Sequence, residues 1–274
     1  MDNLMKKTLR TIFNILLISI FIMPFLWMVI TSIKTVGQTL QTPPSFWVKN
    51  PQWENFVTAV TTIPFFHYLL NSLIVTASTL IIQFLTIIPA AYAFARIDFK
   101  GKNILFGITL STMMIPAQLI FLPVFVMFSK WHLINNVLSI ILLNSATNAF
   151  GIFMLRQTFK QVPEEIIEAA LMDEARQWQI IFKIMLPIAR PTIMTLGLIT
   201  FINSWNDYFW PMILTTTDAA RTLPVGIAGL NSGEASISYN ILMAGIVLLL
   251  LPIIIAFLAS QKQITKAFTY TGIK

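Results

Sequence analysis

The segment "PEEIIEAALMDEARQWQIIFKIMLP", Pro163 to Pro187, is the most strongly charged part of an otherwise apolar chain. It holds five of the eleven acidic residues in the sequence. Pro163 suits a first helical position, and Glu164 and Glu165 then fall in the first turn, where the helix dipole favours negative charge. A second amphipathic stretch follows Arg176. The segment therefore predicts two short amphipathic helices with an exposed polar face.

The rest of the chain has the composition of a membrane protein. Of its 274 residues, 56% are hydrophobic and 11% are charged, unlike an average soluble domain. A helix of about 20 residues crosses an apolar membrane core, and six apolar stretches have about that length. They are 12–33, 72–95, 104–128, 137–155, 190–214 and 238–259. The alternating short segments of a barrel are absent, so we expect an all-α membrane protein with six transmembrane helices.

The first stretch is too long and bulky for a cleaved signal peptide, so it is expected to be retained as a span. The basic residues predict the topology. Fourteen of the eighteen lysines and arginines fall in the termini and loops on one side of six spans, and four fall on the other side. The positive-inside rule assigns the basic side, with both termini, to the cytoplasm. The net charge of +7 therefore indicates membrane topology rather than nucleic-acid binding.

The loops predict a single transmembrane domain over residues 1–274, with its core at about 71–260. The long inner loop, 156–189, contains the charged segment. The outer loop 34–71 is rich in proline and tryptophan and is expected to be ordered. The outer loop 215–237 carries Gly226, Gly229 and Gly233. Prolines inside the spans are expected to kink their helices: Pro24, Pro89, Pro116, Pro123, Pro211 and Pro252.

The charged segment closely resembles the EAA signature of the membrane subunits of ABC importers. The matching residues are Glu168, Ala169, Ala170, Asp173, Ala175, Ile184, Leu186 and Pro187. Pro163 to Pro187 is called the EAA segment below. Other stretches, including "SWNDYFWPMIL" and "TLPVGIAGL", resemble the carbohydrate-type permeases of binding-protein-dependent sugar uptake, and most of all the MalG-like half of a heterodimeric pair. The likeness runs from about Asn71 to the C terminus.

This resemblance implies the fold of a type I ABC importer permease in the bacterial cell membrane. The EAA segment would form coupling helices that dock on a separate ATPase, through Glu164, Glu165, Glu168, Ala169, Ala170, Asp173, Glu174, Ala175, Leu186 and Pro187. The implied partners are a second homologous permease, two nucleotide-binding ATPase subunits, an extracytoplasmic sugar-binding protein and membrane lipid. The implied cargo is a sugar or oligosaccharide, and which sugar or polyol phosphate it is stays open.

Glu174 departs from the family pattern, which usually has glycine at this bend. Glycine tolerates a positive φ that glutamate adopts only at a cost of about 1 kcal/mol or more. Two alternatives stay open at this point: a right-handed bend, or a turn tightened in another way.

The chain lacks a phosphate-binding loop, because its only Gly-Lys pair, at Gly101, has Arg96 where the first glycine of that motif belongs. We therefore expect no cofactor on this chain, with ATP and magnesium on the partner ATPase.

Without cysteine, thiol catalysis and thiolate metal sites are excluded. His67 and His132 have no carboxylates at ligand spacing, so no metal site is expected.

Polar residues in two apolar stretches predict a translocation pathway. In the fifth stretch Asn203, Asn206, Asp207 and Trp210 follow helical i, i+3, i+4, i+7 spacing. The amides and carboxylate suit sugar hydroxyls, and Trp205, Tyr208 and Trp210 offer aromatic faces. Asn144 and Asn148 in the fourth stretch are interpreted in the same way. The structural alternative is that these groups bond neighbouring helices near the outer interface, which is also our interpretation of Gln83 and Gln118.

Two other function classes are weighed. An ion-coupled secondary transporter or channel would work without an ATPase and usually carries several ionisable groups at mid-membrane. Here Asp207 is the only acidic residue inside a predicted span. A membrane-embedded enzyme would need a set of catalytic residues, and the sequence shows no recognisable pattern of this kind.

Overall fold

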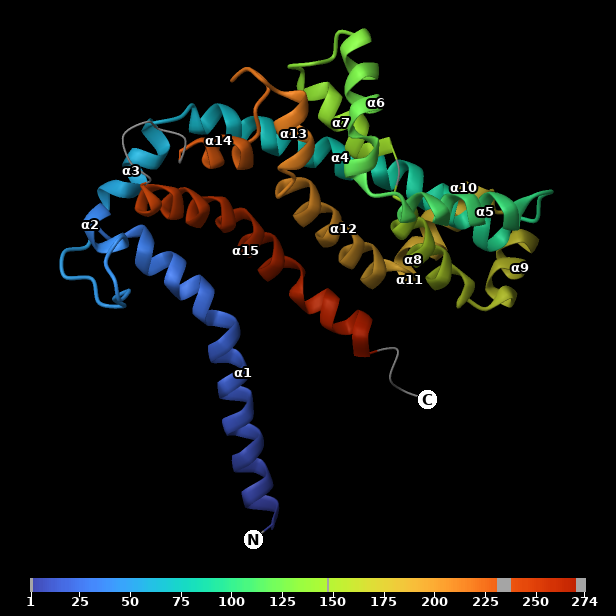
Figure 1. Cartoon of the computed structure of the whole chain (residues 1–274). Helices are drawn as coiled ribbons and strands as arrows, with labels where there is room; N and C mark the ends of the chain where they lie inside the picture. Colours follow the sequence, from blue (N-terminus) through green and yellow to red (C-terminus); the bar gives the residue numbers. More distant parts are fainter. Residues whose placement is uncertain (1, 147, 231–237, 270–274) are drawn as a thin grey trace. The chain divides into compact units, whose positions relative to one another are not determined.

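The computed structural model describes residues 2–146, 148–230 and 238–269, and the regular elements in these ranges are all helices (Figure 1). The chain divides into two compact units. The first comprises residues 1–66 and 225–251, and the second comprises 67–224 and 252–274. Each unit is described by itself.

The helices of the first half are α1 (Asp2–Ser32), α2 (Val36–Thr39), α3 (Glu54–Thr61), α4 (Phe65–Arg96), α5 (Lys102–Ser111), the 3₁₀ turn η1 (Thr112–Met114), α6 (Ala117–Lys130) and α7 (Val137–Ala146). Those of the second half are α8 (Ala149–Lys160), α9 (Glu164–Met172), α10 (Gln177–Ile180), the π-helical turn η2 (Ile181–Met185), α11 (Leu186–Ile188), α12 (Arg190–Trp205), α13 (Phe209–Leu214), α14 (Leu223–Gly229) and α15 (Tyr239–Thr269).

Three single helices are long and apolar enough to cross a membrane, namely Met5–Ser32 in α1, the whole of α4, and Tyr239–Gln261 in α15. Three bent helix pairs raise the number of spans to as many as six. Two of them correspond to the predicted spans 104–128 and 137–155, and the third joins Gln177–Ile188 to the predicted span 190–214. The sequence predicted one continuous helix for each of these three spans. That continuity is wrong: 104–128 and 137–155 break between the paired helices, and 190–214 is interrupted between α12 and α13.

The sharpest break lies between α5 with η1 and α6, whose axes differ by 97°. Ile115 is extended there, with φ −92° and ψ 111°, and Pro116 is the N-cap of α6. Proline disfavours helical geometry in the residue before it, and this explains the location of the break. Other prolines are accommodated, since α1, α4, α6 and α15 each continue through one.

In the first unit, an ordered outer loop closes the end of α1. The Asn55 side chain donates hydrogen bonds of 2.8 and 2.9 Å to the carbonyls of Ser32 and Lys34. Lys34, only 1% exposed, donates to the Ser45 carbonyl at 2.6 Å, and its Nζ lies 4.2 Å from the centre of a Trp27 ring. Burial lowers the pKa of this lysine. These contacts agree with the prediction of an ordered loop.

The second unit has a core that joins the EAA segment to the membrane helices. Its buried residues come from α4, α8, α9, α10, η2 and α12: Ile87, Ala91, Tyr92, Leu155, Phe159, Val162, Ile167, Ile180, Met185, Ala189 and Leu196. In Figure 1 the labels of α5, α8, α9, α10 and α11 lie together at one end of α4. The amphipathic EAA segment therefore packs its apolar side onto α4 and α8.

The other end of α4 contacts the loop before α14 within the same unit. The Tyr68 hydroxyl donates to Asp218 at 2.6 Å, and the Asn71 amide donates to the carbonyls of Ala219 and Arg221. These contacts order the first part of the outer loop 215–237. Gly233 of that loop lies outside the described residues.

Gly151 sets the closest approach between α4 and α8. A Cβ atom at this position would lie 2.8 Å from Cδ1 of Ile87 and 3.0 Å from Oδ1 of Asn148. Ile87 is buried, and the Asn148 oxygen already accepts a hydrogen bond from the Gly151 amide. An added methyl group would therefore press against the end of a buried side chain and against a side chain that is already hydrogen-bonded.

We predict that Gly151→Ala lowers the free energy of unfolding by about 1–3 kcal/mol through overpacking of this contact. Thermal unfolding of the full chain in detergent measures the change. Gly107→Ala is the matched control, because α5 has open space around Gly107, and there the substitution stabilises a helix by about 0.5–1 kcal/mol. Equal effects of the two substitutions would contradict the packing argument.

Candidate functional site

The EAA segment begins with α9, whose first turn contains Glu164 and Glu165 as the sequence predicted. Pro163 is the N-cap rather than the first helical residue. Ile167 is buried, and Ala170 packs against the same core. Ile166 and Leu171 fall at helical spacing with these two residues but are exposed.

The exposed side of α9 combines charge with apolar surface. The carboxylates of Glu164, Glu165 and Glu168 lie on it, and Met172 is 86% exposed. Ala169, which is small, is also exposed and leaves the backbone open to close approach. Exposed apolar side chains rimmed by charges are typical of a protein-binding surface.

A Schellman turn ends α9. The amide of Ala175 donates to the Ala170 carbonyl at 3.0 Å, and the amide of Glu174 donates to the Leu171 carbonyl at 3.0 Å. This motif requires a left-handed residue after the C-cap, usually glycine. Glu174 occupies that position with φ +56°. Of the two alternatives left open by the sequence, a right-handed bend is therefore wrong, and glutamate adopts the geometry for which the family uses glycine.

The second part of the segment turns sharply toward α12. Residues Gln177–Ile188 form α10, η2 and α11, and they meet the helix axis of the following span at 83°. Ile180 and Met185 are fully buried, whereas Trp178 is exposed. Leu186 packs against the core and Pro187 is exposed.

Hydrogen bonds from α4 and α8 hold the EAA segment in place. Arg96, at the end of α4, donates to the carbonyls of Phe159 and Val162, just before α9. The Tyr92 hydroxyl lies 2.6 Å from Oε1 of Gln177, at the start of α10. The chain just before the segment and the middle of the segment are therefore both connected to one helix, α4.

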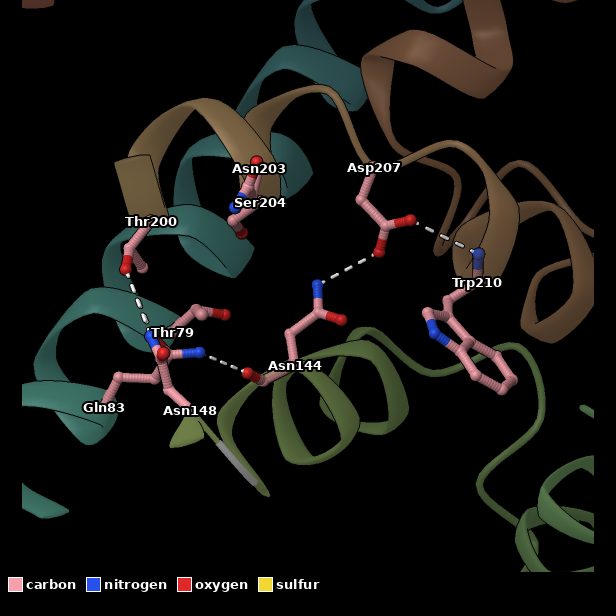
Figure 2. Close-up of a pocket in the computed structure, with 9 residues that line it drawn as sticks. All are labelled: Thr79, Gln83, Asn144, Asn148, Thr200, Asn203, Ser204, Asp207 and Trp210. Carbon is pink, nitrogen blue, oxygen red and sulfur yellow. Dashed lines mark hydrogen bonds between the residues drawn. The ribbon is translucent and has the colours of Figure 1, made fainter. Parts of the chain in front are cut away.

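The same helix, together with α7, α8, α12 and α13, lines a polar pocket of about 200 Å³ in the second unit (Figure 2). Its nine lining residues are Thr79, Gln83, Asn144, Asn148, Thr200, Asn203, Ser204, Asp207 and Trp210. Seven of them are amide or hydroxyl side chains, which both donate and accept hydrogen bonds.

The pocket lies where α7 gives way to α8. Gln83 donates to the Asn144 carbonyl at 2.6 Å, near the end of α7, and Asn148 accepts from the Gly151 amide at 2.7 Å, at the start of α8. Asn148 also donates to Gln83 Oε1 at 2.6 Å. The interpretation of Gln83 as a helix-contact residue is confirmed by these bonds, and Gln83 lines the pocket as well.

A second helix end brings Asp207 into the pocket. The helix α12 stops at Trp205, and Asp207 accepts a hydrogen bond of 3.4 Å from the backbone amide of Trp210, in the first turn of α13. Figure 2 shows Asn144 pointing toward Asp207, to which its amide donates at 3.1 Å.

Five of the eight residues predicted for the pathway line this pocket: Asn144, Asn148, Asn203, Asp207 and Trp210. Asn206 and Tyr208 are exposed elsewhere, and the shared helix face predicted for Asn206 is wrong because α12 ends before it. Trp205 is 1% exposed and stacks on Phe201.

Sequence reasoning missed the pocket hydroxyls Thr79, Thr200 and Ser204. Thr79 stands one turn before Gln83, and Thr200 continues the spacing of Asn203, Ser204 and Asp207 at i, i+3, i+4 and i+7. Counting threonine and serine with the amides at this spacing would have found them.

The part of the chain that the structure describes holds no cluster of three or more histidines, aspartates or glutamates that could bind a metal. His67 contacts the Ala219 carbonyl at 2.9 Å through Nε2.

Residues 86–270 match the family of binding-protein-dependent transport system inner membrane components, and this is more than half of the chain. The chain belongs to this family. It is a multi-pass membrane protein and a transport component, not an enzyme.

Among curated proteins the chain is similar to the diacetylchitobiose uptake system permease protein NgcG of Streptomyces coelicolor, at 32% identity over 89% of this chain and 82% of that protein. It is also 32% identical to the arabinooligosaccharides transport system permease protein AraQ of Bacillus subtilis, over 77% of this chain and 74% of that one.

Among solved structures, a chain of a bacterial ABC transporter involved in the import of the acidic polysaccharide alginate has a TM-score of 0.77 at 25% identity. The match covers 94% of this chain and 97% of that chain. A chain of the MetNI methionine ABC transporter gives a TM-score of 0.53 and shares the fold. The fold is that of type I ABC importer permeases.

The left-handed Glu174 leads to a prediction about the EAA turn. A non-glycine residue pays about 1–2 kcal/mol for left-handed geometry, and glycine loses about 0.5–1 kcal/mol in chain entropy. Glu174→Gly should therefore stabilise the turn by up to about 1 kcal/mol and slow hydrogen exchange in α9 by up to about fivefold.

The control is Ala169→Gly, an exposed position in the interior of α9, which should speed the same exchange because mid-helix glycine costs about 1 kcal/mol relative to alanine. Hydrogen exchange with mass spectrometry on the full chain measures both. Faster exchange in the Glu174→Gly variant would contradict the strained turn.

Proposed function

We propose that this chain forms half of the translocation pathway of an ATP-driven importer for a sugar or oligosaccharide. The observation that carries the proposal is the exposed EAA segment, which packs on the same helices that line the polar pocket. The saccharides named for the similar permeases of Streptomyces coelicolor and Bacillus subtilis support this cargo class.

In the proposed assembly the chain pairs with a second homologous permease and two nucleotide-binding ATPase subunits, and an extracytoplasmic binding protein delivers the cargo. A bacterial alginate ABC transporter has been solved in complex with an alginate pentasaccharide-bound periplasmic protein, and that complex supports such a delivery step. Both termini would lie in the cytoplasm, as the basic loops favour. ATP and magnesium would bind to the ATPase subunits, and this chain would hold no cofactor.

The contacts of α4 and α8 offer a mechanical link between the ATPase and the pathway. Tyr92 on α4 contacts the EAA segment, and Gln83, about 14 Å farther along the same helix, lines the pocket. Likewise α8 begins at the pocket with Asn148 and ends beside α9 with Phe159 in the shared core. A movement of the docked segment would therefore shift two pocket walls together.

The docking surface would include Glu168, Ala169, Asp173 and Glu174 on the outside of the EAA segment, with Ala170, Ala175 and Leu186 packed beneath it. Closure of the ATPase pair on ATP would move Glu164 to Pro187 as a rigid body. The broken helices would then switch the cavity between inward and outward access.

We predict that Glu168→Ala lowers ATP-driven uptake at least about tenfold and reduces co-purification of the ATPase, because a partner group would be left unpaired at a docked surface. The Glu168 side chain is exposed, so membrane insertion should be unchanged. Uptake in proteoliposomes and quantitative mass spectrometry of the purified complex are the measurements.

Asp98→Asn is the matched control. Its carboxylate is fully exposed, lies at the same end of α4 and forms only a surface ion pair with Lys102, whose loss costs about 0–1 kcal/mol. The control should transport normally. Normal uptake by Glu168→Ala as well would overturn the docking role of this residue.

A further inference from the structure

We propose that the polar pocket binds one uncharged sugar ring at a time and rejects rings that carry a carboxylate. The inference rests on the proposed function and adds the substrate class. It starts from the ionisable groups of the pocket: of its nine lining residues, Asp207 is the only acidic one, and none is lysine, arginine or histidine.

The pocket has hydrogen-bonding capacity that its own residues do not use. The Thr79 hydroxyl is buried and has no partner in the described part of the chain, although the residue lines the pocket and is 1% exposed. Buried hydroxyls are rarely left unpaired, so this group points to a polar ligand or water.

Asp207 also has acceptor capacity left. Its oxygens take hydrogen bonds from the Asn144 amide and from the backbone amides of Phe209 and Trp210, whereas a carboxylate accepts about four. Sugar hydroxyls are donors that suit the remaining positions. Asn203, which lines the same pocket, adds an amide that can both donate and accept.

The size and shape favour a single ring. A volume of about 200 Å³ lies below the range of about 300–1,000 Å³ in which drug-sized ligands bind, which suits one sugar ring better than several linked rings. Trp210 contributes an aromatic surface beside Asp207 (Figure 2). The apolar C–H face of a sugar ring packs on such a surface while its hydroxyls reach the amides.

A bound sugar would use the free hydrogen-bonding positions and would also replace some existing hydrogen bonds between side chains. Gln83, Asn148 and Thr200 already bond one another, at 2.6 and 3.3 Å to the Gln83 oxygen. Exchanging these bonds for bonds to a ligand yields little net free energy. The pocket should therefore bind weakly, as a pathway that must release its cargo requires.

A carboxylate on the sugar changes this balance. It would lie within a few ångströms of the Asp207 carboxylate, and no cation lines the pocket to compensate. Like charges at such a distance in a partly desolvated site repel strongly. We expect at least about tenfold weaker binding of a uronate than of the matching neutral sugar.

The test uses the full chain, co-purified with its partners and reconstituted in nanodiscs. Saturation-transfer difference NMR compares methyl β-glucoside with methyl β-glucuronide, and methyl β-galactoside with methyl β-galacturonide. Each pair differs only by a hydroxymethyl group against a carboxylate. The saturation-transfer signal of the Trp210→Ala variant is subtracted from that of the unmodified complex. The difference is assigned to the pocket, because binding elsewhere in the complex contributes equally to both.

The expected result is a Trp210-dependent signal from the neutral glycosides that is at least about tenfold stronger than that from the uronides. Asp207→Asn keeps the shape and removes the charge, so it should bring the uronide signal to within about threefold of the neutral one. Asp98→Asn should leave the preference unchanged. Thr79→Val should weaken the neutral signal.

Equal signals from both members of a pair in the unmodified complex would overturn the inference, and so would a preference that survives in Asp207→Asn. Absence of any Trp210-dependent signal would show that the pocket holds no sugar. ATP-driven uptake measured on the same preparation separates the two claims: if uptake is normal, only the inference fails, and if the chain neither couples to an ATPase nor transports, the proposed function fails.

Discussion

Every break in a membrane helix frees backbone groups, and the structure depends on side chains that satisfy them. Gln83 binds a carbonyl near the end of α7, Asn148 binds an amide at the start of α8, and Asp207 binds an amide of α13. No lipid group can replace these partners, because the apolar core offers no hydrogen bonds. Polar side chains lie together at the pocket because helices end there and their free backbone groups need hydrogen-bond partners.

The same constraint operates at the EAA segment. Arg96 binds one carbonyl in the last turn of α8 and one between α8 and α9, and the Schellman turn at Glu174 closes the end of α9. Since Arg96 and Gln83 belong to one helix, the backbone caps at the two sites are mechanically connected. A permease that transmits motion from an external ATPase needs such a connection between docking surface and pathway.

Much of the fold could be predicted from the sequence, because apolar stretches and amphipathic periodicity report burial directly. The breaks could not, since hydropathy reports composition and not backbone direction. The stretch 104–128 stays apolar across a bend of 97°, for which Pro116 was interpreted only as a kink. Likewise Leu171 fits the periodicity of a packed face and is exposed, because only Ile167 and Ala170 reach the core.

The sequence predicted those residues of the candidate site whose burial in a membrane costs free energy. Asn144, Asn148 and Asp207 were identified because amides and carboxylates are rare in apolar helices. Thr79 and Thr200 were missed because hydroxyls usually bond their own helix backbone and carry little signal. Trp205 was assigned to the pathway by proximity in sequence, and its ring instead stacks within the helix on Phe201.

The central claim, that a separate ATPase docks on the EAA segment, can be tested by cross-linking. The chain contains no cysteine, so Ala169→Cys introduces a single reactive thiol on the exposed side of α9. A maleimide–benzophenone photo-cross-linker attached to this thiol in native membranes should, on irradiation, join this position, but not Asp98→Cys, to a protein that mass spectrometry identifies by its phosphate-binding loop. A thiol at 169 that reacts with a soluble maleimide yet never cross-links, in a chain that transports without ATP, would contradict the account.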